Sequence, residues 1–242
     1  MGNSRLHWAC FREKTLLKTW DTEHLTSSVG KNNLPSEAKL YPRKGYPTPI
    51  YIASVVPAQT ALWQNYAQRT VLSLADIPLG EMYPTFGIDR ALAVWGGGCK
   101  YGFPVLVIDG GTALTFTGVD SEKKLVGGAI IPGLQTQLTA LEKYTAVLPK
   151  VDLPPQLPQL WAKKTPEAIT SGIIHTLIAG IANFVNDWRE KFPQSTVIFT
   201  GGDRELIFHY LQQKFPKITN NSVTDSQVIF WGLSSLISHQ SP

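Results

Sequence analysis

Three short glycine-containing segments stand beside the ends of expected strands. They are Gly2-Asn3-Ser4, Asp109-Gly110-Gly111-Thr112 and Thr200-Gly201-Gly202. Glycine lets backbone amides approach an anion closely, and neighbouring hydroxyl groups add donors, so such turns can cradle the phosphates of a nucleotide. Each segment alone is better explained as an ordinary tight turn. The set of three favours a nucleotide held in a cleft between two halves of the chain.

Two acidic residues lie where they can take part in chemistry. Asp109 follows the apolar residues 105–108, at the carboxyl end of an expected buried strand, where α/β sheets bind ligands. It can hold a cation while Thr112 donates to a phosphate, or it can simply cap the turn. Asp89, in Gly87-Ile88-Asp89-Arg90, can act as a general base beside an anion-binding arginine. The residues alone favour a simpler interpretation of Asp89, as an acid that stabilises the first turn of a helix.

Alternating strands and helices position these residues. Residues 5–11 predict one arm of a hairpin, and residues 21–49 predict a polar surface connection. Residues 50–56, 57–69 and 70–74 predict a strand, a helix and a strand, and therefore a parallel pair of strands.

The second half also opens with a glycine turn followed by a hairpin. Thr165 before Pro166 predicts the N-cap of a long helix ending near Phe192, although a ligand carboxylate can also bind at that helix start. The other expected elements are a short helix over 87–96 closed by Gly96-Gly97-Gly98, strands over 105–108, 113–119, 127–132 and 197–199, and helices over 133–145, 203–215 and 226–239. The sequence therefore predicts an α/β fold.

Composition limits the class of protein. At 242 residues, 43% hydrophobic and 17% charged, the chain is globular, with one large domain or two modest ones. A net charge of +4 helps attract an anionic small molecule but is too small to indicate nucleic acid. The most apolar stretch, residues 172–188, is broken by polar residues, so we expect no membrane span.

The cysteines and histidines exclude two further classes. Cys10 and Cys99 are the only cysteines, and the N-terminus lacks a secretory signal, so we expect a reduced, cytoplasmic protein without disulfides. The five histidines show no metal-ligand spacing, which argues against a zinc site. There is no Gly-x-Ser-x-Gly elbow, Walker A loop or dinucleotide fingerprint.

A series of motifs spread over most of the chain resembles the type III pantothenate kinases, which belong to the superfamily of acetate kinases, sugar kinases and actin. The matching segments, in chain order, are Ser54-Val55-Val56-Pro57, Gly87-Ile88-Asp89-Arg90, Tyr101-Gly102-Phe103-Pro104, Asp109 to Thr115, Gly127 to Leu134, Thr145 to Pro149, Lys164 to Ile173, and Thr200-Gly201-Gly202. The resemblance implies two ribonuclease-H-like domains, residues 1–103 and 104–242, with ATP in the cleft between them and a homodimer. It also implies transfer of the γ-phosphoryl group of ATP to the hydroxyl of pantothenate, the first step toward coenzyme A.

The resemblance also implies a role for individual residues. Asp89 would be the general base that takes the proton from the pantothenate hydroxyl. Asp109 would hold a monovalent cation, K⁺ or NH₄⁺, and Mg²⁺ would accompany ATP. The other implied contacts are those of Gly87, Ile88, Arg90, Thr165 and Tyr83 with pantothenate, and those of Gly2, Asn3, Ser4, Arg5 and Thr112 with ATP.

The N-terminus departs from the family pattern. The family opens with a strand that ends in Asp-x-Gly-Asn-Thr or Ser, and its aspartate helps hold Mg²⁺. Here Gly2-Asn3-Ser4 matches the end of that motif, so the aspartate would fall before Met1. Either the start lies too far downstream or this lineage has lost the acid. We favour the first explanation, because a sheet without its first strand has an unpaired edge.

Two other functions stay open at this point. One is a catalytically impaired regulatory or binding protein on the same fold, which the N-terminal departure supports. The other is a different small-molecule kinase of the superfamily. Retention of Asp89, Arg90, Asp109, Thr112 and Thr165 favours an active kinase, and the segments around Asp89 and Thr165 point to pantothenate.

Overall fold

The computed structural model describes residues 1–30, 34–35 and 48–237. The chain divides into two compact units. Unit 1 comprises Met1–Pro78, Tyr83–Gly96 and Ile229–Pro242, and unit 2 comprises Leu79–Met82 and Gly97–Val228. The C-terminal segment thus belongs to the unit that contains the N-terminus. The predicted division at residues 103 and 104 into two ribonuclease-H-like domains stays a prediction.

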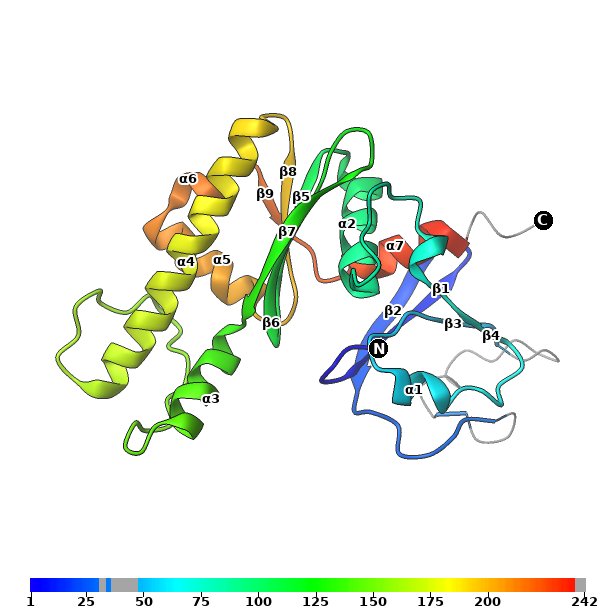
Figure 1. Ribbon diagram of the computed structural model, residues 1–242, viewed down its shortest axis with the longest axis horizontal. Helices are drawn as coiled ribbons and strands as arrows, with labels where there is room; N and C mark the ends of the chain where they lie inside the picture. Colours follow the sequence, from blue (N-terminus) through cyan, green and yellow to red (C-terminus); the bar gives the residue numbers. More distant parts are fainter. Residues whose placement is uncertain (31–33, 36–47, 238–242) are drawn as a thin grey trace. The chain divides into compact units, whose positions relative to one another are not determined.

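Unit 1 contains two small sheets (Figure 1). Strands β1 (Leu6–Arg12) and β2 (Thr15–Thr22) form an antiparallel hairpin, and β3 (Ile50–Ile52) pairs in parallel with β4 (Arg69–Val71). The predicted hairpin and β-α-β unit are therefore confirmed. Of the predicted connection over 21–49, residues 21 and 22 belong to β2, and residues 31–33 and 36–47 lie outside the described residues.

The helix of this β-α-β unit is shorter than predicted. Helix α1 (Pro57–Ala61) begins at its proline, but turns replace it before β4, and a 3₁₀ helix (Leu74–Asp76) follows that strand. Two aromatic side chains from the turn region, Trp63 and Tyr66, are buried with Val29 and Ile52 in the core of unit 1. Tertiary burial of these rings thus outweighs the helical spacing seen in the sequence.

Unit 2 is built on a five-stranded sheet in the order β7-β6-β5-β8-β9. Strands β7 (Leu125–Pro132), β6 (Ala113–Val119) and β5 (Val105–Gly110) pair antiparallel, whereas β8 (Thr196–Thr200) and β9 (Ser222–Thr224) continue from β5 in parallel. All four strands predicted for this half are present, and β9 was not expected. The mixed sheet with its helices confirms the α/β fold class.

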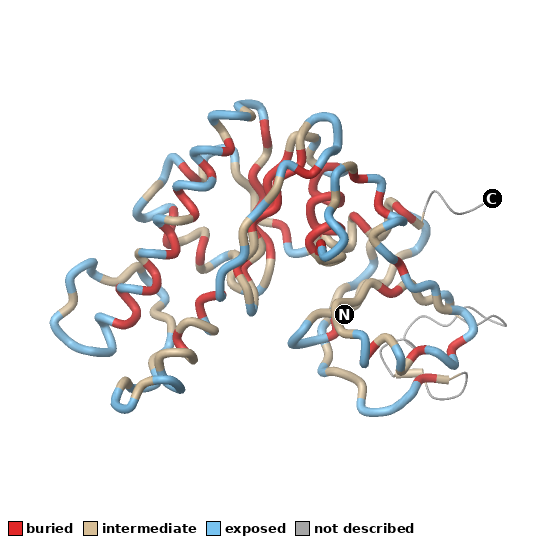
Figure 2. The backbone as a smooth tube through the Cα atoms, in the orientation of Figure 1, coloured by how far each residue is buried: buried red, intermediate tan, exposed pale blue. Residues whose placement is uncertain are grey.

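Helices pack against this sheet and bury its residues (Figure 2). Helices α4 (Thr165–Lys191), α5 (Arg204–Lys214) and α6 (Pro216–Thr219) lie on one side of the sheet in Figure 1, and α3 (Leu134–Tyr144) follows β7. The predicted apolar stripe of α4 is buried in the core with residues of β5, β6 and β8, namely Ile173, Ile174, Leu177, Ile178, Ile181 and Val185. This stripe holds the helix against the sheet.

Helix α4 is also long and apolar enough to cross a membrane by length and composition, which the sequence analysis did not expect. It has 27 residues, and 56% of its most apolar 18-residue window is buried. A buried core helix passes the same test, so this helix alone is weak evidence for a membrane.

Helix α2 (Ile88–Tyr101) corrects another prediction, because it continues through the three glycines expected to end it. A Cβ atom on Gly98 would lie 2.1 Å from the Phe103 ring, and one on Gly97 would lie 2.7 Å from Ile198 Cδ1. These glycines therefore let the helix pack closely against Phe103 and Ile198 instead of ending it. The last helix, α7 (Val228–Ile237), begins two residues later than predicted, and residues 238 and 239 of the predicted helix lie outside the described residues.

Candidate functional site

The first turn of α2 carries the acid predicted to be catalytic. Asp89 Oδ1 accepts a hydrogen bond from the backbone N–H of Arg90 at 2.8 Å, as an acid at a helix start does. A Cβ atom on Gly87 would lie 2.5 Å from the same carboxylate oxygen. Glycine at position 87 thus leaves room for the Asp89 carboxylate to lie against the backbone before the helix. Ile88 is the first residue of the helix.

Arg90 is held by two aromatic side chains. It is only 9% exposed, and its guanidinium group donates to Tyr83 Oη at 3.0 Å. The guanidinium carbon lies 4.9 Å from the centre of the Phe86 ring, a cation–π contact. The structure therefore brings together Tyr83 and Arg90, two of the predicted pantothenate contacts. A planar guanidinium fixed in this way is suited to binding an anion in one orientation.

The N-terminal turn belongs to the same unit as Asp89. Gly2 N–H donates to the Arg5 carbonyl at 3.0 Å, and a ring nitrogen of His24 lies 2.9 Å from the Gly2 carbonyl oxygen. The Met1 amino group donates to the Ala53 carbonyl at 2.5 Å. Burial lowers the pKa of this amine, and the negative charge of Asp89 opposes that effect. The predicted ATP segment Gly2, Asn3, Ser4 and Arg5 thus starts in the electrostatic neighbourhood of the predicted base.

In unit 2, three loops meet at the carboxyl end of β5. Asp109 lies between Thr115 of β6 and Thr200 of β8 in the sheet register. Gly201 has φ of 86°, and a Cβ atom there would lie 2.3 Å from both Asp109 Oδ1 and the Gly110 carbonyl oxygen. The turn after β8 can therefore approach Asp109 only with glycine at position 201.

The loop after β7 closes on the turn that contains Thr112. A Cβ atom on Gly133 would lie 1.9 Å from the Gly111 carbonyl oxygen. The Thr112 carbonyl accepts hydrogen bonds from Gly133 N–H at 2.9 Å and Thr136 Oγ1 at 2.7 Å. The Asp109-to-Thr112 turn is thus held by the start of α3 on one side and by the turn after β8 on the other.

Asp203 also lies beside the Asp109-to-Thr112 turn, although the sequence analysis did not identify it as a site residue. Its backbone N–H donates to the Gly110 carbonyl at 2.9 Å, and burial raises the pKa of its half-buried carboxyl group. The signal was present, since an acid directly follows Gly201-Gly202 after a buried strand. Without the register between β5 and β8, nothing in the sequence places this acid beside Gly110.

The oxygen atoms at the Asp109-to-Thr112 turn are ligands of the kind that hard cations prefer. Asp109 supplies carboxylate oxygens beside a backbone turn so close that it excludes a Cβ atom at Gly201. K⁺ and Mg²⁺ bind carboxylate, carbonyl and water oxygens, so the residues present fit an oxygen-coordinated cation. Within the described ranges, no three or more His, Cys, Asp or Glu side chains form a metal-binding group.

Thr165 lies at a different place in unit 2. It is the first residue of α4, and the N-cap is Lys164, so the prediction of Thr165 as N-cap is wrong by one residue. It lines an open cavity of about 450 Å³ together with Leu148, Ala162, Lys163, Lys164, Ala168 and Ile169. Two lysines and a hydroxyl therefore border a partly apolar hollow at this helix start.

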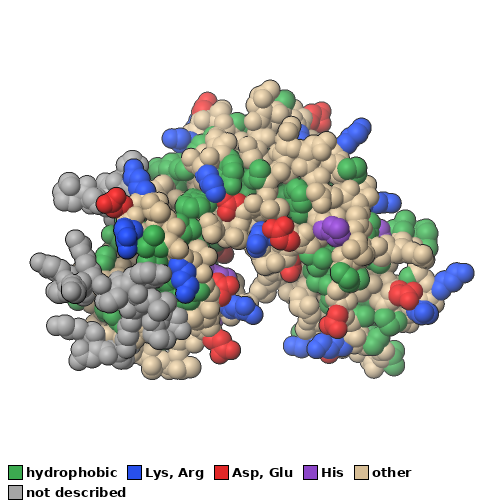
Figure 3. Space-filling model, turned by 180° about the vertical axis from the view of Figure 1, so that it is seen from behind, with side chains coloured by type: hydrophobic (Ala, Val, Ile, Leu, Met, Phe, Trp, Pro, Cys, Tyr) green, Lys and Arg blue, Asp and Glu red, His purple; other side chains and the backbone are tan. Residues whose placement is uncertain are grey.

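Charges of both signs are interspersed over the face of the described residues shown in Figure 3. Neither Cys10 nor Cys99 forms a disulfide bond in the described part of the chain.

Comparison with known proteins gives a consistent result. The sequence profile of the family described as type III pantothenate kinase matches residues 1–187. Curated proteins named type III pantothenate kinase are 46% identical in Nostoc sp. (98% of this chain, 92% of the relative), 42% in Synechocystis sp. (98% and 88%) and 40% in Thermosynechococcus vestitus (98% and 87%).

A solved structure extends the comparison to the fold. It is that of a conserved protein from Campylobacter jejuni named as a Baf family transcriptional activator, with a TM-score of 0.64. The match covers 98% of this chain and 94% of the other at 18% identity. At that identity the likeness shows a shared fold alone.

Proposed function

This chain belongs to the type III pantothenate kinase family, and on that premise we propose that it transfers the γ-phosphoryl group of ATP to the hydroxyl of pantothenate. The products are 4'-phosphopantothenate and ADP, in the first step of coenzyme A biosynthesis. The observation that carries the proposal is the pairing at the start of α2 of an acid, Asp89, with an arginine fixed by Tyr83 and Phe86.

Asp89 acts as the general base in this proposal. Its carboxylate accepts the proton as the pantothenate oxygen attacks the γ-phosphorus, so the O–H bond breaks, a new O–P bond forms and the bond to ADP breaks. A positioned base of this kind contributes on the order of 100- to 10,000-fold to the rate. Gly87 and Ile88 place the carboxylate, and Arg90 and Tyr83 bind the anionic substrate.

Phosphate binding is assigned to the glycine turns. Backbone amides of Gly2, Asn3, Ser4 and Arg5 in unit 1 and the hydroxyl of Thr112 in unit 2 contact ATP. Asp109 would hold a monovalent cation, K⁺ or NH₄⁺. Mg²⁺ would accompany ATP and would supply positive charge that offsets the negative charge of the phosphoryl group. The close backbone packing at Gly201 and Gly133 supports a turn of fixed shape at Asp109.

The remaining proposals concern assembly and place in the cell. Thr165 contacts pantothenate, the protein acts as a homodimer in the cytoplasm, and its ligands are small molecules, with no nucleic acid or membrane partner. The exposed apolar side chains of Tyr144, Val147 and Trp161 in unit 2 support association. Light scattering coupled to gel filtration checks the dimer.

A direct assay tests the proposed function. The purified chain is incubated with ATP, Mg²⁺, K⁺ and pantothenate, ADP release is followed, and phosphopantothenate is identified by mass spectrometry. We expect ADP release that depends on pantothenate. Absence of product, with ATP and pantothenate both still bound, would favour a regulatory protein on this fold. Phosphorylation of a sugar or of acetate in place of pantothenate would favour another kinase of the superfamily.

The variant Asp89→Asn tests the role of the base. It keeps the side-chain shape but cannot accept the proton, so we expect pantothenate binding to persist and kcat to fall about 100- to 10,000-fold. Asp152→Asn, an exposed acid in the segment before α4, removes the same charge and is the matched control. Full turnover by Asp89→Asn would show that another group takes the proton.

A further inference from the structure

Two histidine rings lie beside the N-terminal turn of unit 1. A ring nitrogen of His24 donates to the Gly2 carbonyl at 2.9 Å, and Gly2 N–H donates to the Arg5 carbonyl at 3.0 Å. Both backbone groups of Gly2 are therefore paired, which fixes the shape of the turn. The second ring belongs to His7, and the proposed function does not use it.

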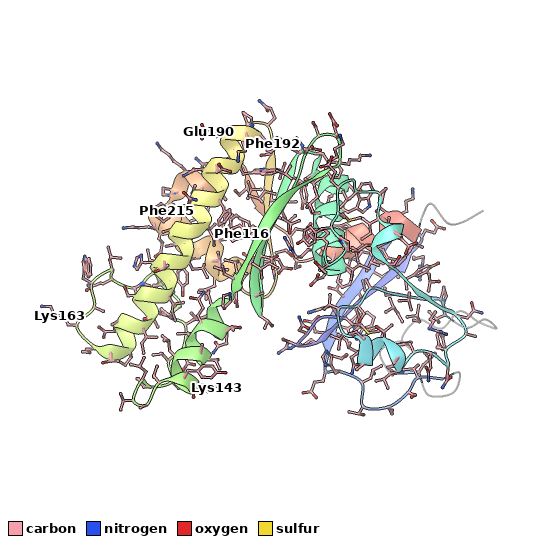
Figure 4. The ribbon with its side chains drawn as sticks, viewed as in Figure 1. Phe116, Lys143, Lys163, Glu190, Phe192 and Phe215 are labelled. Atoms are coloured by element: carbon pink, nitrogen blue, oxygen red, sulfur yellow. The ribbon has the colours of Figure 1, made fainter. Side chains whose placement is uncertain are left out.

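The alternation of β1 directs the His7 side chain away from the core of unit 1. Leu6, the residue before it, is 2% exposed, and Trp8, the residue after it, packs against that core. The His7 side chain is 51% exposed. Successive side chains of a strand point to opposite faces, and side chains extend from both faces of the β1–β2 hairpin (Figure 4). A ligand at the N-terminal turn can therefore reach His7 without disturbing the core.

Asp21 fixes the orientation of the His7 ring. The two residues face each other in the register of β1 and β2, and His7 Nδ1 donates to Asp21 Oδ1 at 2.7 Å. Because an ionised carboxylate only accepts hydrogen bonds, this pair places a proton on Nδ1. Within the part of the chain that the structure describes, the other ring nitrogen, Nε2, has no hydrogen-bond partner.

The Nε2 edge of the ring faces the glycine turn. His7 Nε2 lies 3.5 Å, and His7 Cδ2 lies 3.6 Å, from the position that a Cβ atom on Gly2 would occupy. An anion bound to the backbone amides of this turn can therefore accept a hydrogen bond from Nε2. An imidazole that donates from both nitrogens is cationic, and such a charge-assisted bond to a phosphate is stronger than a neutral one.

We propose that His7, oriented by Asp21, binds a phosphate group of ATP through Nε2. The inference rests on the proposed function and extends it, because it adds a cationic side chain to the backbone amides of Gly2, Asn3, Ser4 and Arg5. All of these residues belong to unit 1. His7 contacts the phosphate-donating substrate, so its loss affects the binding of ligands that carry phosphate.

Isothermal titration calorimetry with ATP, tripolyphosphate and adenosine, each with Mg²⁺ and without pantothenate, tests this contact. For His7→Leu we expect Kd for ATP and for tripolyphosphate to rise about three- to tenfold, the effect of losing one exposed hydrogen bond. Kd for adenosine should stay unchanged. His7→Gln keeps an N–H donor on a side chain of similar length, so it should lose less affinity than His7→Leu.

His209→Leu is the matched control. It removes a ring of α5 in unit 2 whose printed neighbours are the neutral amides of Gln156 and Gln213. It should change none of the three dissociation constants.

A double-variant cycle tests the orienting role of Asp21. Asp21→Ala should weaken ATP binding in the wild-type protein, because the His7 ring is no longer held with Nε2 toward the turn. In the His7→Leu protein the same change should weaken ATP binding no further. An equal loss in both proteins would show that Asp21 acts independently of His7 and would overturn its orienting role.

The outcomes separate this inference from the proposed function. A wild-type protein that binds neither ATP nor tripolyphosphate contradicts both. A wild-type protein that binds ATP and forms phosphopantothenate, together with a His7→Leu variant of unchanged Kd, overturns the role of His7 and leaves the kinase function standing. Equal losses with ATP and adenosine would also overturn it, because they would show that His7 maintains the fold and does not contact phosphate.

Discussion

Single residues in unit 2 are fixed by what their neighbours leave room for. Gly201 and Gly202 are adjacent in sequence, yet the space available for a side chain differs between them. A Cβ atom on Gly201 meets the Asp109 carboxylate and the Gly110 backbone, and its φ is positive, whereas a Cβ atom on Gly202 meets nothing within 4 Å. The first glycine is therefore required by the site, and the second is not required by packing.

This difference predicts the effect of a single methyl group. Gly201→Ala should lower the free energy of unfolding by about 2 kcal/mol or more, because a left-handed residue with a Cβ is strained and the backbone of Gly110 cannot easily move. It should also weaken the proposed binding of a monovalent cation at Asp109, since this carboxylate must shift. Gly202→Ala is the control and should change stability by less than about 1 kcal/mol. Urea denaturation measures both, and equal losses would contradict the structural reason.

At the scale of elements, packing requires a glycine in one helix and does not require a glycine in another. Gly98 of α2 faces the Phe103 ring at a separation that no Cβ atom tolerates. Gly180 of α4 has open space where its Cβ atom would be. Gly98 therefore lowers the helical propensity of α2 but allows its close packing, whereas in α4 no contact requires Gly180.

We accordingly expect Gly98→Ala and Gly180→Ala to shift stability in opposite directions. Gly98→Ala should destabilise the protein by about 1–3 kcal/mol through overpacking. Gly180→Ala should stabilise it by about 0.5–1 kcal/mol, because alanine loses less backbone entropy in a helix. Chemical denaturation of the two variants checks the signs. Destabilisation by Gly180→Ala would indicate a contact at that face of α4 in solution.

At the scale of the whole molecule, an ion pair within unit 2 joins Lys100 and Asp225, which are 125 positions apart in the sequence. The buried Asp225 carboxylate accepts hydrogen bonds from Lys100 Nζ at 2.7 Å and Tyr101 Oη at 2.8 Å, and from Gln227 N–H at 2.7 Å. Burial alone would raise the pKa of Asp225, but the hydrogen bonds from Lys100, Gln227 and Tyr101 outweigh it and hold the pKa below its usual value. The end of α2 is thereby joined to the segment between β9 and α7.

The ion pair between Lys100 and Asp225 predicts that the stability of the protein depends on pH. Because the folded pKa of Asp225 is depressed, the stabilisation is complete above the unfolded pKa of about 4 and is lost as pH falls through the folded pKa. At pH 7 we expect Asp225→Asn to lower the free energy of unfolding by about 1–3 kcal/mol, with the difference from wild type shrinking below about pH 4. Urea denaturation from about pH 3 to about pH 7 measures this. A difference that is constant with pH would show that the charge is not responsible.

The local features of this protein follow from its sequence alone. Apolar runs and turns specified the hairpins, the β-α-β order and the α4 stripe, because periodicity and turn chemistry depend on near neighbours. The motif series identified the family and nominated Asp89, Arg90, Asp109 and Thr165, whose catalytic and binding roles stay predictions. Element ends were the weaker part, as in α1 and at Thr165, because they depend on which side chains become buried.

The contacts between residues far apart in the sequence depend on the tertiary structure. Helix α2 continues through its glycines because the Phe103 ring and Ile198 occupy the space that a side chain at Gly98 or Gly97 would need. The tertiary structure also places Asp203 beside Gly110 and Lys100 beside Asp225, because strand register and long-range packing fix such pairs. No local pattern encodes these contacts, since each depends on segments that approach only after the sheet of unit 2 has formed.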